Sequence, residues 1–76
     1  MQRQALRAIA HRISTSLADG GIDGPASREM IYRELSIACT DPRNTGLTDD
    51  ERELIVGVMV PRDLAKIQRT KEGLSK

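Results

Sequence analysis

The fold is decided by residues 48–60, which read TDDERELIVGVMV. The second half of this stretch is rich in β-branched side chains, which are typical of strands. The first half is a helix start, because Thr48 can accept from a first-turn N–H and Glu51 can reach back to the Thr48 N–H. Three acidic residues in that turn also suit the positive end of the helix dipole. Since no partner strand is evident elsewhere, we predict that a helix follows Thr48.

Pro61 leaves two possibilities open for this helix. A proline ring clashes with the carbonyl four residues back, which here belongs to Gly57. Pro61 therefore either kinks the helix or opens a further one. The apolar pattern continues to about Lys71, and Gly73 is expected to end the helix. We expect the last residues, 74–76, to be frayed.

Upstream, residues 3–18 show the clearest helical pattern in the chain. Gly20 and Gly21 are expected to end this helix, because glycine accepts the left-handed conformation of a helix C-terminus. Three basic side chains, Arg3, Arg7 and His11, follow one another at four-residue spacing on a second face. The apolar face repeats at three- and four-residue steps and consists of Leu6, Ile9, Ala10, Ile13 and Leu17.

Another helix is predicted from near Pro25 to about Cys39. Proline suits the first helical position, because its missing N–H needs no partner there. The pair Asp41-Pro42 ends this helix, and residues 40–47 form a loop. The expected apolar face is Met30, Ile31, Leu35 and Ala38. The sequence thus predicts an all-α fold: one domain, residues 1–76, with three or four short helices in a bundle or an orthogonal array.

The predicted core is thin. The chain has 76 residues, no Trp, no Phe and one Tyr, so the core must be aliphatic. A core of this size rarely supplies more than ~3–5 kcal/mol of stability by itself. The single Cys cannot form an internal disulfide. We therefore expect that a partner protein or a second copy supplements the core, and we predict a homodimer.

Charge is unevenly distributed, although the net charge is only +1. Residues 18–60 carry nine acidic side chains against four arginines, while both ends of the chain are basic. A nearly neutral chain argues against a dedicated nucleic-acid binder, whose domain pI usually exceeds about 9. No apolar run approaches the ~18 residues of a membrane span, so we predict no membrane partner. A lone Cys fits a reducing compartment, and the expected location is cytoplasmic.

No metal or cofactor site is predicted. Asp19, Asp23 and Gly24 match positions one, five and six of a calcium-binding loop. Positions three and twelve, which should be ligands, are Gly21 and Met30. The same glycine-rich turn lacks the Lys and Ser/Thr of a phosphate-binding loop. Both readings therefore fail, and we expect an ordinary connection between two helices.

No catalytic residues are predicted. His11 lies near Ser14 and Thr15, but one helix face cannot also provide a group that orients the histidine and an oxyanion hole. Cys39 has no second cysteine and is expected to be a buried, inert thiol. The sequence predicts a protein that is not an enzyme.

The leading hypothesis is a non-catalytic protein-binding module. Small helical proteins of this kind often belong to phages or mobile elements, so we expect a regulator or inhibitor that docks on a larger host protein. The chain has more apolar residues than one narrow stripe along each helix needs in order to form the core. Apolar patches that stay exposed typically mark contacts with other proteins. The predicted interface residues are Tyr32, Val56, Met59 and Val60.

The alternative hypothesis is a small DNA-binding regulator. Residues 48–69 can be aligned with a helix-turn-helix in which Gly57 lies in the turn. The likeness is poor, because Glu53 falls where a small residue should pack between the helices. The candidate nucleic-acid contacts lie on the last helix and are Arg62, Lys66, Arg69 and Lys71.

Overall fold

The computed structural model describes residues 2–74 and shows a small array of helices. The predicted all-α fold is confirmed, since residues 2–74 contain no strand. None of the helices within these residues combines the length and the apolar character that crossing a bilayer requires. The elements are α1 (Arg3–Asp19), α2 (Arg28–Ala38), η1 (Pro42–Asn44), α3 (Asp49–Leu54), η2 (Ile55–Met59) and α4 (Val60–Leu74).

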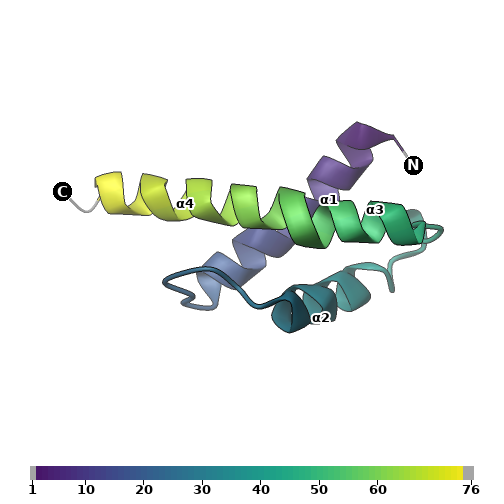
Figure 1. Ribbon diagram of the computed structural model, residues 1–76, viewed down its shortest axis with the longest axis horizontal. Helices are drawn as coiled ribbons and strands as arrows, with labels where there is room; N and C mark the ends of the chain where they lie inside the picture. Colours follow the sequence, from purple (N-terminus) through teal and green to yellow (C-terminus); the bar gives the residue numbers. More distant parts are fainter. Residues whose placement is uncertain (1, 75–76) are drawn as a thin grey trace.

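Three consecutive elements, α3, η2 and α4, form one continuous rod along the long axis of the molecule (Figure 1). Helix α1 crosses this rod and packs against η2 and α4. Helix α2 packs against α1 and η2. Within the rod, η2 therefore contacts both α1 and α2.

Helix α1 forms as its spacing predicts. Its buried side chains include all five residues of the predicted apolar face. The helix stops at Asp19, and the Gly20 N–H donates to the Ser16 carbonyl at 3.0 Å. Gly21 then takes a φ of 91°, which side chains with a Cβ rarely adopt. Of the two glycines, Gly21 is the one that needs its conformational freedom.

Helix α2 starts later than the sequence indicated. The expected start near Pro25 is wrong, because Ser27 caps the helix by accepting a hydrogen bond from the Met30 N–H at 3.2 Å. The preceding segment is held by Gln68 of α4, whose Nε2 donates to the Ile22 and Gly24 carbonyls at 3.0 Å each. Met30, expected on the apolar face, is exposed.

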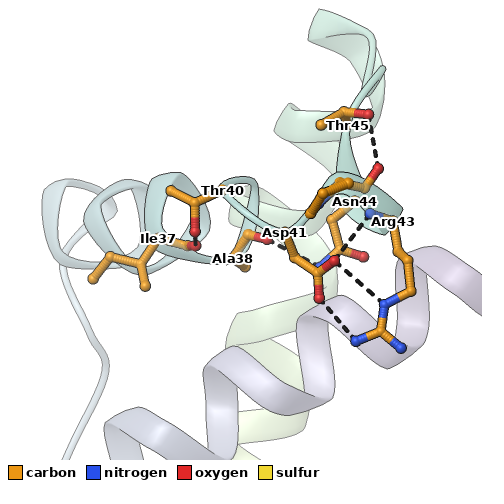
Figure 2. Close-up of polar contacts among 8 residues, drawn as sticks. Ile37, Ala38, Thr40, Asp41, Arg43, Asn44 and Thr45 are labelled. Carbon is orange, nitrogen blue, oxygen red and sulfur yellow. Dashed lines mark hydrogen bonds and ion pairs between the residues drawn. The ribbon is translucent and has the colours of Figure 1, made fainter.

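A network of local hydrogen bonds shapes the turn between α2 and α3 (Figure 2). The Asp41 carboxylate accepts from the Arg43 N–H at 3.0 Å and from the Arg43 guanidinium at 2.9 Å. These bonds lower the pKa of Asp41. The Asn44 side-chain amide donates to the Ala38 carbonyl at 3.0 Å, which ties η1 back to the end of α2.

The predicted capping box at the start of α3 is confirmed. The Glu51 N–H donates to Thr48 Oγ1 at 3.1 Å, and the Thr48 N–H donates to Glu51 Oε1 at 2.9 Å. Asp49, Asp50 and Glu51 all lie in the first turn, where the helix dipole favours negative charge. This local signal starts the rod that carries η2 and α4.

We expect Thr48→Ala to lower the free energy of unfolding by about 1 kcal/mol, because it removes the acceptor for a first-turn N–H. Urea denaturation monitored by circular dichroism measures the change. Thr45→Ala is a matched control, because the Thr45 hydroxyl donates only to the Pro42 carbonyl in the adjoining loop. Equal midpoints for the two variants would contradict the capping role.

Pro61 does not interrupt the rod, and it directly follows a turn that is not α-helical. The turn before it is a π-helix, in which the Val60 N–H donates to the carbonyl of Ile55, five residues back. Pro61 is then the second residue of α4, where its missing N–H needs no intrahelical partner. The wider turn thus accommodates the proline while the helix axis continues (Figure 1).

The π-helix also decides which side chains of residues 54–60 are buried. A hydrogen bond between residues five apart places Ile55 and Val60 nearly one above the other on the same face. Ile55, Val56 and Val60 are 0%, 1% and 0% exposed. The expectation that Val56 and Val60 are available to a partner is therefore wrong, because both side chains belong to the core.

Ser14 lies where α1 packs against the rod. Its side chain is 0% exposed, and it is the buried polar residue of the core. The hydroxyl donates to the Ala10 carbonyl at 2.8 Å and lies 3.4 Å from the Val60 carbonyl across the interface. A small side chain at this position lets the two helices cross closely.

Candidate binding groove

Tyr32 belongs to a cluster that joins α2 to α3. The Arg28 guanidinium donates to both Glu53 carboxylate oxygens, at 2.8 and 2.7 Å, and the Tyr32 hydroxyl donates to Glu53 Oε1. Arg28 also lies over the Tyr32 ring, 5.7 Å from its centroid. Tyr32 is half-buried, and its polar end is engaged within the chain.

This cluster shifts the pKa of both acidic groups. The hydrogen bond to Glu53 is the main cause that raises the pKa of Tyr32. The hydrogen bonds from Arg28 and then from Tyr32 lower the pKa of Glu53. The Glu53 contribution to stability is present above its unfolded pKa of about 4.3 and is lost as the pH falls through the lowered value. The Tyr32 contribution is present below about pH 10 and is lost as the pH rises through the raised value.

Because Tyr32 is the only tyrosine and there is no tryptophan, its phenolate can be titrated directly by near-ultraviolet absorbance. We expect the wild-type midpoint to lie above the ordinary value of about 10, and Glu53→Gln to lower it. The control is Glu29→Gln, which removes a carboxylate of α2 that makes no hydrogen bond to Tyr32 among the described residues. Identical titrations of wild type and Glu53→Gln would show that the contact does not form.

A second polar contact links α1 to α4. His11 Nδ1 lies 3.2 Å from Asp63 Oδ2, and the His11 side chain is largely exposed. His11 belongs to the row of basic side chains on α1, and Asp63 lies in the first turn of α4. Asp63 also lines a hollow in the surface.

We call this hollow the arginine groove. It lies between the first half of α1 and the rod, and its floor includes the half-buried side chains of Leu54 and Met59 together with Val58, which is 38% exposed. It encloses about 200 Å³, less than the ~300–1,000 Å³ of typical small-molecule sites. The residues that line it are Arg3, Arg7, Ala10, Leu54, Val58, Met59, Arg62 and Asp63.

Three arginines give the groove its charge. Arg3 and Arg7 come from α1, and Arg62 comes from α4. Within residues 2–74 none of the three guanidinium groups pairs with a carboxylate. Asp63 is the acidic residue of the lining, and His11 is hydrogen-bonded to its carboxylate. The groove therefore combines an apolar floor with an excess of positive charge.

The structure separates the residues that the sequence proposed for an interface. Met59 lines the groove, whereas Val56 and Val60 are in the core and Tyr32 does not line the groove. Among the proposed nucleic-acid contacts, Arg62 lines the groove. Lys66 and Arg69 are exposed farther along α4, and Lys71 Nζ lies 3.5 Å from the Ala18 carbonyl. The groove thus brings together Met59 from the proposed protein interface and Arg62 from the proposed nucleic-acid contacts.

Sequence reasoning proposed only two of the eight lining residues, Met59 and Arg62. Arg3 and Arg7 were placed on one helix face by their spacing, but nothing in the spacing showed that this face lies beside Arg62. Leu54 and Val58, which also line the groove, were in neither proposed set. The row formed by Arg3, Arg7 and His11 was the available signal.

A wider hollow of about 480 Å³ lies between α1 and the end of α2. Arg12 gives its lining a single guanidinium group. The other polar groups have partners within the described residues, since Ser16 Oγ lies 3.4 Å from Glu34 and the Thr40 hydroxyl donates to the Ile37 carbonyl. Asp41 is paired with Arg43 (Figure 2). These contacts leave this hollow less suited to a charged ligand than the arginine groove.

Within residues 2–74, no three His, Cys, Asp or Glu side chains come together as metal ligands would. The hydroxyl of Ser14, which lies near His11 in the sequence, is engaged with helix carbonyls in the core. Comparison with known protein families, with curated proteins and with solved structures found no match. Arguments about function therefore rest on the geometry of the arginine groove.

Proposed function

We propose that this protein is a non-catalytic binding module that docks on another protein through the arginine groove and thereby regulates or inhibits it. The observation that carries the proposal is the groove itself, in which an exposed Val58 and a half-buried Met59 lie beside arginines that have no carboxylate partner among the described residues. Met and Arg are enriched at protein interfaces. An apolar anchor surrounded by polar groups is the arrangement that typically carries interface affinity.

The DNA-binding alternative has less support. Arg62, Lys66 and Arg69 are exposed on α4, which is what contacts with phosphates need. The apolar floor of the groove, however, has no complement in a phosphate backbone. Tyr32 is the single aromatic residue and is held by Glu53, so it is not free to stack on bases.

Site-specific photo-crosslinking tests the proposal. Val58 is replaced by p-benzoylphenylalanine, and the protein is irradiated in an extract of its source cells. We expect one protein adduct, which excess unlabelled wild-type protein removes and nuclease does not. Ile37 provides the control position, because it is 59% exposed and lies outside the groove.

An adduct that forms equally from position 37, or no adduct from position 58, would contradict docking through the groove. A nuclease-sensitive adduct, together with salt-dependent retardation of duplex DNA, would favour the DNA-binding alternative. The homodimer expected from the thin core stays a prediction, and light scattering at micromolar concentrations tests it.

A further inference from the structure

We infer that the occupant of the arginine groove is an acidic amphipathic helix of the partner protein. This inference rests on the proposed function and names the chemistry of the partner. Its basis is the placement, between α1 and the rod, of three guanidinium groups around an apolar floor, none of which has a carboxylate partner in the part of the chain that the structure describes.

We call Arg3, Arg7 and Arg62 the rim of the groove, and their charge favours carboxylates on the partner. Guanidinium groups bind carboxylates through two parallel hydrogen bonds, which gives both strength and orientation. Elsewhere in this chain Arg43 binds Asp41 in this way, through Nε and Nη2, and Arg28 binds both Glu53 oxygens through Nη2. Arg3, Arg7 and Arg62 have no such partner within residues 2–74. With Asp63 as the acidic member of the lining, the groove keeps an excess of positive charge.

The floor specifies an apolar side chain between those carboxylates. Val58 and Met59 reach the surface from the π-helix, which directs Ile55 and Val60 into the core instead. A hollow of about 200 Å³ has room for a side chain rather than for a whole small molecule. A phosphate backbone would pair with the arginines but would leave the apolar side chains of the floor exposed to water. A peptide therefore fits the groove better than a nucleic acid.

The spacing of the rim specifies a helix. Arg3 and Arg7 are one turn apart on α1, which corresponds to a rise of about 6 Å. Acidic residues spaced four apart on a second helix repeat at the same interval. An apolar residue between them then faces the floor, as in other complexes where a helix lies in a groove.

Phage display tests the inference with random 16-residue peptides as probes and the full-length protein as bait. We expect enriched peptides to be net negative, to carry acidic residues four apart and to contain an intervening large apolar residue. For the synthesised peptides, Arg7→Glu/Arg62→Glu should weaken binding at least tenfold. The control, Arg33→Glu/Arg69→Glu, makes the same change in net charge outside the groove and should weaken it less than twofold.

The other outcomes separate the two proposals. Neutral or basic peptides whose binding is lost with Val58→Ser would overturn the acidic helix and leave the docking function standing. Peptides unaffected by any groove variant, or no enrichment, would overturn both. Self-association or DNA binding that Arg7→Glu/Arg62→Glu abolishes would identify a second copy or a nucleic acid as the occupant and overturn the inference. If the charge-reversal variant Arg7→Glu/Arg62→Glu does not fold, the neutral variant Arg7→Gln/Arg62→Gln is used in the same binding measurement.

Discussion

Replacing Ile55 with alanine lowers the free energy of unfolding by about 2–5 kcal/mol. Ile55 is 0% exposed in the π-helix and lies where the rod contacts both α1 and α2. Its removal leaves a cavity that these three elements cannot close independently. Since a core of this size rarely supplies more than about 3–5 kcal/mol of stability, the loss is a large share of the total. Urea denaturation and thermal melting measure the change.

Val58→Ala is the matched control for Ile55→Ala. It shortens a β-branched residue of the same π-helix, but the side chain is 38% exposed, so we expect a change within about 0.5 kcal/mol. Equal losses for the two variants would mean that residues 55–59 do not divide between core and groove as the structure shows. The arginine groove would then lose its floor.

Ser14→Leu is expected to have the second largest effect. Ser14 is fully buried where α1 crosses the rod, and its hydroxyl donates to the Ala10 carbonyl. Loss of the hydroxyl interactions costs about 0.5–1.5 kcal/mol. The larger side chain adds about 1–3 kcal/mol, because a well-packed interface has no room for it. Both terms appear as a lower midpoint of urea denaturation.

Ser14→Ala separates these two terms, because it removes the hydroxyl without adding volume. We expect it to be clearly more stable than Ser14→Leu. If the two variants unfold at the same urea concentration, the helices do not approach closely at this position. That result would bear on function as well, since the same crossing brings Arg7 of α1 beside Arg62 of α4.

Local signals predicted much of the secondary structure. The capping box at Thr48 and the glycines after Asp19 act over one helical turn, so they are readable in sequence and are confirmed. The start of α2 was misplaced because Pro25 and Ser27 are both acceptable near a helix start. Gln68 of α4 binds the segment before Ser27 and favours the later start.

The candidate site was only partly predictable. Met59 and Arg62 were proposed from sequence, each for a different function, and both line the groove. Val56 and Val60 were proposed for an interface because the apolar residues exceed what one narrow stripe needs. Both side chains are instead in the core, where they pack with Leu64 and the buried face of α1.

The sequence by itself determined that this chain is helical and where most of its helices end, because capping, glycine conformation and apolar periodicity act between near neighbours. Tertiary structure decided which apolar residues stay at the surface and which charges meet. Arg7 and Arg62 are far apart in the chain and share a groove only because α1 crosses the rod at Ser14. The physical reason is that burial and charge clustering depend on how helices pack, and packing is set by contacts that no local pattern contains.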